Sequence, residues 1–277
     1  MLDQEDNYTN SISVLPFLKW AGGKRWLVNK YAHIFPDTYE RYVEPFVGSG
    51  AVFFHLQPER SILSDMNADL IQTYQAIKDD WRSVWKILEE YHCMHSEEFY
   101  YEIREKSFRS TSKRAARFIY LNRTCWNGLY RVNMRGEFNV PIGTKMDVIR
   151  DVDNFSAVSQ LLNGASLYSC DFETCIKRAK ENDFLFIDPP YTIKHNNNGF
   201  IKYNDKLFSW DDQIRLRDSV CSAVDRGVKV LVTNADHSSI RALYKGVGKF
   251  ISLDRASIIS GKSEGRGRYS ELLVKCY

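Results

Sequence analysis

Seven short runs of apolar, β-favouring residues are spread along the chain, and helical patterns separate several of them. The runs cover residues 41–47, 61–64, 165–169, 184–187, 228–233, 250–253 and 270–276. Strands that alternate with helices form a mainly parallel sheet, because each parallel connection must cross over one face of the sheet. The sequence therefore predicts an α/β fold with a doubly wound, Rossmann-like sheet.

The spacing of the runs is uneven. About 100 residues separate the second run from the third, far more than the dozen or so that a crossover connection needs. Helical patterns occupy residues 69–92, 97–106 and 112–125, and a hairpin with its turn near 133–136 follows. We expect an inserted, mainly helical domain with a β-hairpin at 69–159, a sheet domain at 16–68 and 160–277, and a flexible terminus at 1–15. A further helix should begin at the cap Ser209 and end before Gly227.

Charge is concentrated in the inserted region, although the chain as a whole carries only +3. Residues 99–150 contain eleven Lys and Arg against four acidic residues, a net charge of +7. A local basic surface favours binding to phosphate groups, and a solvated helix face is the alternative. The chain shows neither a membrane-spanning apolar stretch nor a secretory signal, so we expect a cytoplasmic protein. The six scattered cysteines predict no disulfide and no metal site.

The segment Asp188-Pro189-Pro190-Tyr191 follows the apolar run 184–187 directly, where an open α/β sheet binds its ligands. The prolines fix the backbone and remove donors, which leaves an acidic acceptor, bare carbonyls and an aromatic ring. The exocyclic amine of adenine is a poor nucleophile, and acceptors for its two protons stabilise the transition state of an attack by its nitrogen. Tyr191 offers a ring for an extruded base. The alternative is a Pro-Pro pair that merely ends a strand.

Other motifs suit a nucleoside cofactor. The loop 46–50 has a Gly-x-Gly pattern that lets the backbone approach a ligand, although a plain tight turn is equally compatible. Asp65 ends the next run and can hold ribose hydroxyls, so that NAD is not excluded. Asp171 and Phe172 follow the third run, where Asp171 can also cap a helix. The mixture of aromatic, glycine and lysine residues at 17–24 suits an anionic or nucleotide ligand. An ATPase is excluded, because Ala256 stands where a phosphate loop ending in Gly261-Lys262-Ser263 needs glycine.

Together these motifs resemble the Dam-type DNA adenine N6-methyltransferases. The resemblance runs from residue 17 to residue 277 and keeps the family's order of cofactor loop, recognition region and DPPY segment. Its most specific stretch is 121–133, continued at 136–143, which is similar to the family's recognition hairpin. The resemblance implies direct transfer of a methyl group from S-adenosylmethionine to a flipped-out adenine in duplex DNA, within the site GATC. It implies no metal and no covalent enzyme intermediate.

The same resemblance implies roles for three sets of residues. Arg131 would read a guanine and Lys19 a second base, Trp126 would insert into the duplex, and Asn133 and Asn139 would contact phosphates. The catalytic set is Asp188, Pro189, Pro190 and Tyr191. The cofactor-binding set is Trp20, Lys24, Phe46, Gly48, Gly50, Asp65, Asp171 and Phe172. The DNA-binding set is Lys19, Trp126, Asn127, Leu129, Arg131, Asn133 and Asn139.

Two positions depart from the family's pattern: Thr144-Lys145 replaces a phosphate-binding arginine, and Trp126 stands where tyrosine is usual. The loop 195–200 is either a cover for the flipped base or an idle surface loop. Three rival functions stay open, namely a cytosine-amine methyltransferase, an RNA base methyltransferase and an idle DNA-binding protein. Neighbouring genes, rather than this chain, decide between restriction-modification, mismatch repair and a phage.

Overall fold

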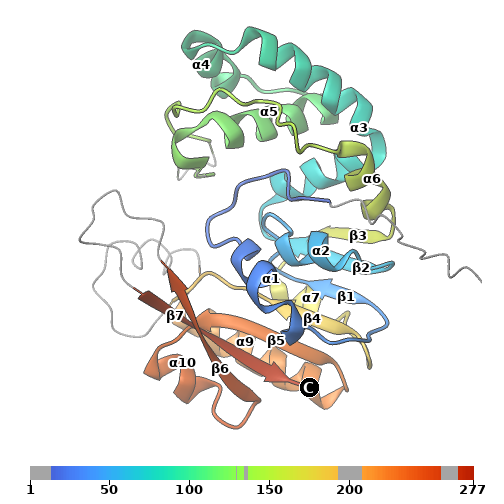
Figure 1. The fold of residues 1–277 in the computed structure, drawn as a ribbon, viewed down its shortest axis with the longest axis vertical. Coiled ribbons are helices and arrows are strands. Elements are labelled where there is room, and N and C mark those ends of the chain that lie inside the picture. The colour runs from blue at the N-terminus through green and yellow to red at the C-terminus, as the bar shows by residue number, and fades with distance from the viewer. Residues whose placement is uncertain (1–13, 129, 134–136, 193–207, 257–267) are drawn as a thin grey trace, which may run out of the picture.

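The computed structural model describes residues 14–128, 130–133, 137–192, 208–256 and 268–277. Its centre is a seven-stranded sheet with the order β3-β2-β1-β4-β5-β7-β6 (Figure 1). Neighbours from β3 to β5 pair in parallel, and β7 runs antiparallel to both β5 and β6. The predicted mixed α/β fold is therefore confirmed. The strands are β1 (Tyr42–Glu44), β2 (Ser61–Asp65), β3 (Ala165–Ser169), β4 (Phe184–Ile187), β5 (Lys229–Ala235), β6 (Lys249–Ala256) and β7 (Arg268–Cys276).

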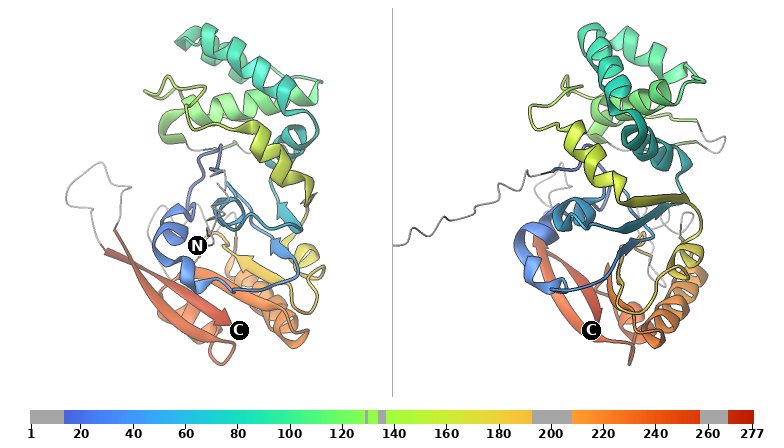
Figure 2. Two further views of the ribbon diagram at one scale, coloured as in Figure 1. Left: turned by 45° about the vertical axis from the view of Figure 1, so that its right-hand side comes forward. Right: turned by 90° about the vertical axis from the view of Figure 1, so that its right-hand side faces the viewer.

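Helices cover both faces of the sheet (Figure 2). In β4, Phe184 and Phe186 belong to one core, and Leu185 and Ile187 belong to the other. This alternation explains why the run 184–187 is apolar at every position, as parallel strands buried on both faces must be. The first core includes α1 (Arg25–Tyr31), α2 (Ala51–Leu56) and α3 (Ala68–Met94), and the second includes α7 (Phe172–Ile176), α9 (Trp210–Asp225) and α10 (Ser238–Leu243).

The strand order reverses between β1 and β4. From β1 the chain proceeds outward to β2 and β3, and from β4 it proceeds in the opposite direction to β5. The two central strands pair in register, with Tyr42 opposite Phe184 and Val43 opposite Leu185. The loop 46–50 and the segment 188–191 therefore leave the sheet side by side at its carboxyl edge. Open α/β sheets bind their ligands at such a reversal.

Helix α3 connects the sheet to a helical region at one end of the molecule (Figures 1 and 2). Before Asp80, the helix packs on the sheet, where the Tyr74 hydroxyl donates to the Gly48 carbonyl at 3.0 Å and Lys78 Nζ to the Ala165 carbonyl at 2.7 Å. At Asp80 the backbone leaves helical geometry, with φ at −153°. The rest of α3 then packs with α5, and the helical region comprises α4 (Glu97–Glu105), α5 (Thr111–Thr124) and α6 (Phe155–Asn163).

Several local predictions can be compared with these elements. The capping box at Ser209 is confirmed, because its hydroxyl accepts from Asp212 N and the Asp212 carboxylate accepts from Ser209 N. The first strand is shorter than the predicted run 41–47, because Pro45 has no N–H to continue the ladder. Residues 132 and 138 pair antiparallel, as do 125 and 142, while the predicted turn at 134–136 lies outside the described residues. The terminus 1–13, the loop 195–200 and residues 261–263 also lie outside them. Among the described residues, no helix is long and apolar enough to cross a membrane.

Candidate active site

Asp188 is the first residue after β4 and carries a carboxylate into the carboxyl edge of the sheet. Its Oδ1 accepts a hydrogen bond of 2.6 Å from the Thr233 hydroxyl on β5 and lies 2.8 Å from Lys24 Nζ. Within the described part of the chain, these side-chain bonds both fall on Oδ1, so Oδ2 keeps its capacity to accept. One oxygen of Asp188 is thus fixed by the protein while the other can serve a ligand.

Lys24 lies between a partly buried carboxylate, Asp188, and a buried one, Glu271. Its ammonium is 2.8 Å from Asp188 Oδ1 and 3.5 Å from Glu271 Oε2 on β7, and it lies 4.9 Å from the centre of the Tyr191 ring. The Tyr191 hydroxyl donates to Glu271 Oε2 at 2.7 Å. The single positive charge and the tyrosine hydroxyl therefore hold both acids and the ring in one network.

Burial governs the ionisation of this network. Burial raises the pKa of Asp188, while the charge and hydrogen bond of Lys24 and the bond from Thr233 lower it. Burial also raises the pKa of Tyr191 well above its usual value, and the charges of Asp188 and Glu271 add to that rise. The tyrosine hydroxyl is therefore protonated at neutral pH and remains a donor, and Lys24 opposes the rise that burial causes in the pKa of Asp188.

The loop after β1 is tied to the end of β2. Gly48 N donates to Asp65 Oδ2 at 3.1 Å, and Asn67 N donates to Asp65 Oδ1 at 2.9 Å. Gly48 has φ at +47°, and a Cβ at this position would lie 2.6 Å from Trp20 Cδ1. Only glycine allows this backbone conformation together with this approach of the indole. The structure therefore brings the predicted cofactor residues Trp20, Gly48 and Asp65 together.

Aromatic rings gather beside this loop. Phe46 stacks on Phe172 with ring centres 5.6 Å apart, and Phe208 packs against both. The guanidinium of Arg215 lies 4.9 Å from the centre of the Phe172 ring and pairs with Asp171 at 3.2 Å. Asp171 caps α7 by accepting from the backbone of residue 173, as the sequence allowed. Its half-exposed side chain reaches the rings through Arg215. Gly50 begins α2.

Glu44 ends β1 at the reversal point and is 3% exposed. Its Oε2 is buried and has no hydrogen-bond partner among the described residues. Burial raises the pKa of Glu44 well above its usual value; the neighbouring Tyr42 hydroxyl lowers it in part, and the charges of Asp188 and Asp65 raise it further. A buried carboxylate oxygen without a partner is costly, so the site suits a cationic ligand or a proton.

The predicted DNA-binding residues lie in and beside the segment that follows α5. Trp126 is 53% exposed, which is unusual for so large an apolar side chain. Asn127 is exposed with φ at +56°. Arg131 is exposed, and its Nε donates to Asn139 Oδ1 at 3.2 Å. Asn133 donates to a side-chain oxygen of Glu137 at 2.8 Å. Leu129 lies outside the described residues.

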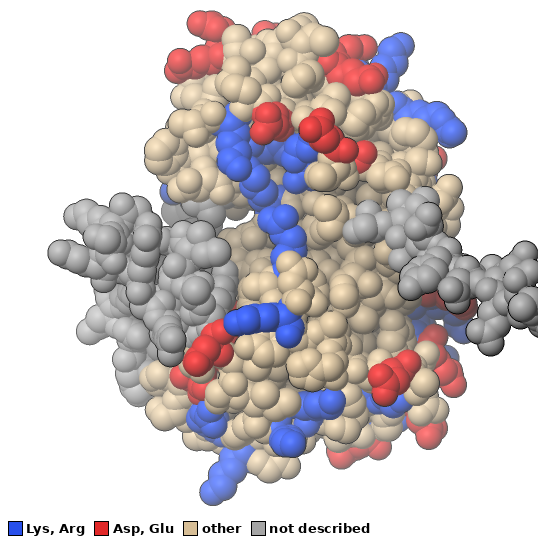
Figure 3. Space-filling view, in the orientation of Figure 1, with Lys and Arg blue, Asp and Glu red and all other residues tan. Residues whose placement is uncertain are grey.

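Trp20 links the loop after β1 to this segment. Its indole stacks on the Tyr130 ring at 5.9 Å with an interplanar angle of 18°, and Tyr130 donates to Asp69 on α3 at 3.2 Å. On this side of the molecule, Lys and Arg side chains form a column from the helical region towards the sheet (Figure 3). The predicted cofactor and DNA-binding sets therefore adjoin each other.

Sequence reasoning missed two acids of the site. The sequence patterns assigned no role to Glu44 or to Glu271. Each acid lies within a run that is predicted to be a strand of the sheet, and an acid at such a position is a signal that a buried charge has a partner or a function. The sequence patterns assigned no role to Thr233 either.

Comparisons with known proteins identify the family of the chain. Residues 20–262 match the family described as D12 class N6 adenine-specific DNA methyltransferase. The type II methyltransferase M1.LlaDCHI of Lactococcus lactis subsp. cremoris is 35% identical over 277 residues, which cover 97% of this chain and 97% of the relative. The type II methyltransferase M.MjaIII of Methanocaldococcus jannaschii is 36% identical, with 96% of this chain and 100% of the relative covered.

A DNA adenine methylase of Escherichia coli is 34% identical over 266 residues, which cover 93% of this chain and 94% of the relative. The family match spans most of the chain, from Trp20 before α1 to beyond the described end of β6. The chain therefore belongs to the D12 class N6 adenine-specific DNA methyltransferases and is an adenine-specific DNA methyltransferase of the Dam type.

Proposed function

We propose that this enzyme takes its methyl group from S-adenosylmethionine and transfers it to a flipped-out adenine within GATC in duplex DNA. The observation that carries the proposal is the Asp188 carboxylate at the strand-order reversal, with Oδ1 held by Lys24 and Thr233. Oδ2 accepts one proton of the adenine amine, and the Pro189 carbonyl accepts the other. Both bonds strengthen as positive charge develops on the amine nitrogen, so they act on the transition state.

Tyr191 supports the same step by stacking on the extruded base. Its hydroxyl bond to Glu271 and the nearby Lys24 ammonium fix the orientation of the ring. Pro190 fixes the backbone between the ring and the acceptors. Holding the amine in line with the methyl donor supplies much of the rate, since a positioned reaction avoids the loss of entropy of a chance encounter.

The residues on the cofactor side fit S-adenosylmethionine, which supplies a methyl group on a cationic sulfonium. Asp65 has lone pairs beyond its two backbone bonds and can accept from ribose hydroxyls. Phe46, Phe172 and the Asp171 carboxylate suit the adenine ring and its amine. The orphaned Glu44 oxygen suits the positive charge of such a ligand. Lys24, Trp20, Gly48 and Gly50 complete the wall of this site.

We assign DNA recognition to the region 69–159 together with Lys19. The exposed Trp126 inserts into the duplex with Asn127 and Leu129 beside it, and Arg131 reads a guanine through O6 and N7. Asn133 and Asn139 contact phosphates, which positions the protein without reading sequence. The assignment of GATC rests on the resemblance of Lys19 and Arg131 to the family's base-reading positions.

Expression of the chain in a methylation-free host, followed by sequencing that detects methyladenine, tests this proposal. We expect N6-methyladenine in GATC, and none with Asp188→Ala, whose purified protein still binds S-adenosylmethionine. The control Glu181→Ala alters an exposed acid at the opposite end of β4 and should methylate normally. Methylation of another site would overturn GATC, and full activity of Asp188→Ala would overturn the catalytic assignment.

A further inference from the structure

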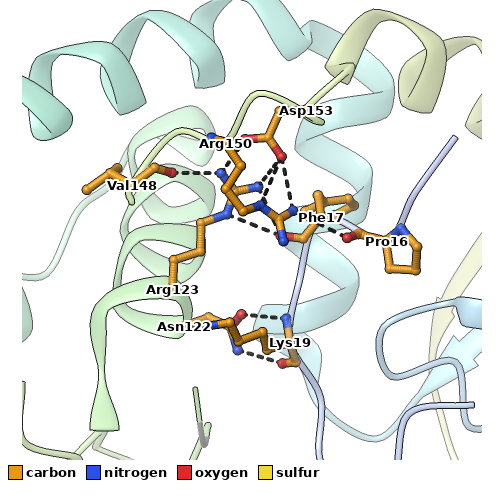
Figure 4. Close-up of polar contacts among 8 residues, drawn as sticks. All are labelled: Pro16, Phe17, Lys19, Asn122, Arg123, Val148, Arg150 and Asp153. Atoms are coloured by element: carbon orange, nitrogen blue, oxygen red, sulfur yellow. Dashed lines mark hydrogen bonds and ion pairs between the residues drawn. The ribbon is translucent and has the colours of Figure 1, made fainter. Parts of the chain in front are cut away.

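The backbone of Lys19 is held by one buried side chain from the helical region (Figure 4). Lys19 N donates to Asn122 Oδ1 at 2.9 Å, and Asn122 Nδ2 donates to the Lys19 carbonyl at 2.8 Å. The two residues are 103 positions apart in the sequence, and Asn122 lies in the last turn of α5 with no exposed surface. The amide of Asn122 thus satisfies both backbone groups of Lys19, as a neighbouring strand would.

The residues before Lys19 are fixed from the same helix. Arg123 donates to the Phe17 carbonyl from Nε at 3.2 Å and from Nη2 at 3.0 Å, and it forms a buried ion pair with Asp153 at 2.5 Å. Arg150 also pairs with Asp153 and donates to the Pro16 carbonyl at 3.3 Å. The segment 16–19 therefore has one backbone position relative to α5 (Figure 4).

The side chain of Lys19 is confined separately, by Gly128. This glycine ends the 3₁₀ turn η2 (Trp126–Gly128) and has φ at +65°. A Cβ at position 128 would lie 2.5 Å from Lys19 Cδ and 3.1 Å from Lys19 Cβ. The aliphatic stem of Lys19 thus passes so close to Gly128 that any other residue at position 128 would displace the stem. Trp126 and Asn127 belong to the same turn, so Lys19 is held against the element that bears them.

The surroundings of the Lys19 ammonium are cationic. Burial lowers its pKa to about 8, and the nearby Lys145 and then Arg150 contribute to the decrease. Two amines brought together in this way repel each other, and an electronegative ligand relieves the repulsion. Guanine O6 and N7 or a phosphate oxygen would have that effect. The stem of Lys19 is thus held in place although its charge is disfavoured there, which indicates a position selected for a ligand.

We propose that Asn122 and Gly128 are positioning residues for sequence specificity, which fix the backbone and the stem of Lys19 so that its ammonium meets one particular base pair. The inference rests on the proposed function, in which Lys19 reads a base. Neither residue touches DNA in this account; each acts through Lys19.

Gly128→Ala is the primary test, because it leaves the bonds of Asn122 and Arg123 intact and displaces only the lysine stem. The measurement is kcat/KM on a duplex with the preferred site and on duplexes with one base pair changed at each position in turn. We expect discrimination to fall about 5- to 150-fold at one base pair, the one at which Lys19→Ala also loses it. Discrimination at the Arg131-dependent guanine should stay unchanged, as should the Kd for S-adenosylmethionine.

The double variant Lys19→Ala/Gly128→Ala separates positioning from a general defect. Two changes that act through one side chain are not additive, so the double variant should lose no more discrimination than Lys19→Ala alone. Gly246→Ala is the matched control. Gly246 has φ at +84° and nothing within 4 Å of the added Cβ, so it reports the backbone strain without a displaced lysine, and its specificity should equal that of the unaltered enzyme.

Asn122→Leu supplies a second, independent variant of similar volume that removes both bonds to the Lys19 backbone. The folded Asn122→Leu variant should lose discrimination at the same base pair. The inference is wrong if Gly128→Ala keeps full discrimination, loses activity equally on every duplex, or adds its effect to that of Lys19→Ala. If Lys19→Ala itself leaves specificity unchanged, the role of Lys19 in the proposed function fails as well. If Lys19→Ala loses discrimination while Gly128→Ala and Asn122→Leu keep it, the role of Lys19 in the proposed function stands and only the positioning role is wrong.

Discussion

At the scale of single residues, the Lys24 ammonium lies between the partly buried Asp188 and the buried Glu271. Lys24 faces Asp188 and Glu271, and the Tyr191 hydroxyl donates to Glu271. A buried carboxylate without this cation would take up a proton, because burial disfavours the charged form. A protonated Asp188 would offer a donor where the adenine amine needs an acceptor. The position of Lys24 therefore bears on the chemistry as well as on the cofactor pocket in which the sequence placed it.

Lys24→Gln should shift the acid limb of the pH profile of kcat to higher pH. The charge of Lys24 lowers the Asp188 pKa against the effect of burial, so its loss raises that pKa. Activity requires the carboxylate and falls as the pH drops through the pKa. Thr233→Val, which removes a weaker stabilising bond, should shift the limb in the same direction by less. An acid limb that stays in place in both variants would contradict the role given to Lys24.

Arg131→Ala should cost about 1–3 kcal/mol of discrimination at a single guanine. The Arg131 guanidinium is exposed, and its Nε donates to Asn139; among the described residues, this bond does not use the terminal nitrogens that would face a base edge. Competition between duplexes that differ at one base pair measures this loss. Asn133→Ala serves for comparison, since a residue that contacts phosphate should weaken binding to every duplex alike. If Arg131→Ala weakened binding to every duplex equally, Arg131 would contact the DNA phosphates and would not read a base.

At the scale of elements, the end of α5 joins the two parts of the molecule. Arg123 is 1% exposed, and its guanidinium is satisfied by the carbonyls of Phe17 and Val148 and by Asp153. All these partners lie outside the helix, so α5 is connected both to the segment before α1 and to the segment before α6. The turn η2 begins three residues after Arg123.

Asp153→Ala should lower the free energy of unfolding by about 3–5 kcal/mol, because it leaves the buried charge of Arg123 without its partner. Chemical denaturation followed by circular dichroism measures the change. Asp218→Ala is the control, since Asp218 pairs with Arg217 at the surface and is 64% exposed; its loss should cost less than about 1 kcal/mol. Equal stability of the two variants would mean that the network does not secure α5.

The elements also show how far sequence patterns reach. The strands 165–169 and 184–187 were predicted with the bounds that the structure has, because turn residues flank short apolar runs. The kink of α3 at Asp80 was not predicted, since it separates packing on the sheet from packing on α5 and neither partner is near in sequence. Glu271 was missed for the same reason, because its partners Lys24 and Tyr191 come from other elements. The residues that a buried side chain contacts depend on the topology of the fold, and local sequence periodicity does not reveal them.

At the scale of the whole molecule, the net charge of residues 99–150 is larger than the positive charge that this region exposes to DNA. The count of +7 in residues 99–150 includes Arg117, Arg123 and Arg150, yet the structure uses all three inside the fold. Arg117 donates to two carbonyls at the end of α4, and the other two share Asp153. Exposed cations such as Lys145 are the ones that can release counterions from a phosphate backbone.

The dependence of DNA binding on salt tests this distinction. The logarithm of the association constant should fall linearly with the logarithm of salt concentration, and Lys145→Gln should reduce the slope by about 1, since each phosphate contact contributes about 0.9. Lys229→Gln is the control, because Lys229 begins β5 at the amino edge of the sheet, where it donates to the Thr38 carbonyl. Its slope should match that of the unaltered enzyme. A slope that Lys145→Gln leaves unchanged, or that Lys229→Gln reduces as much, would show that Lys145 does not contact a DNA phosphate.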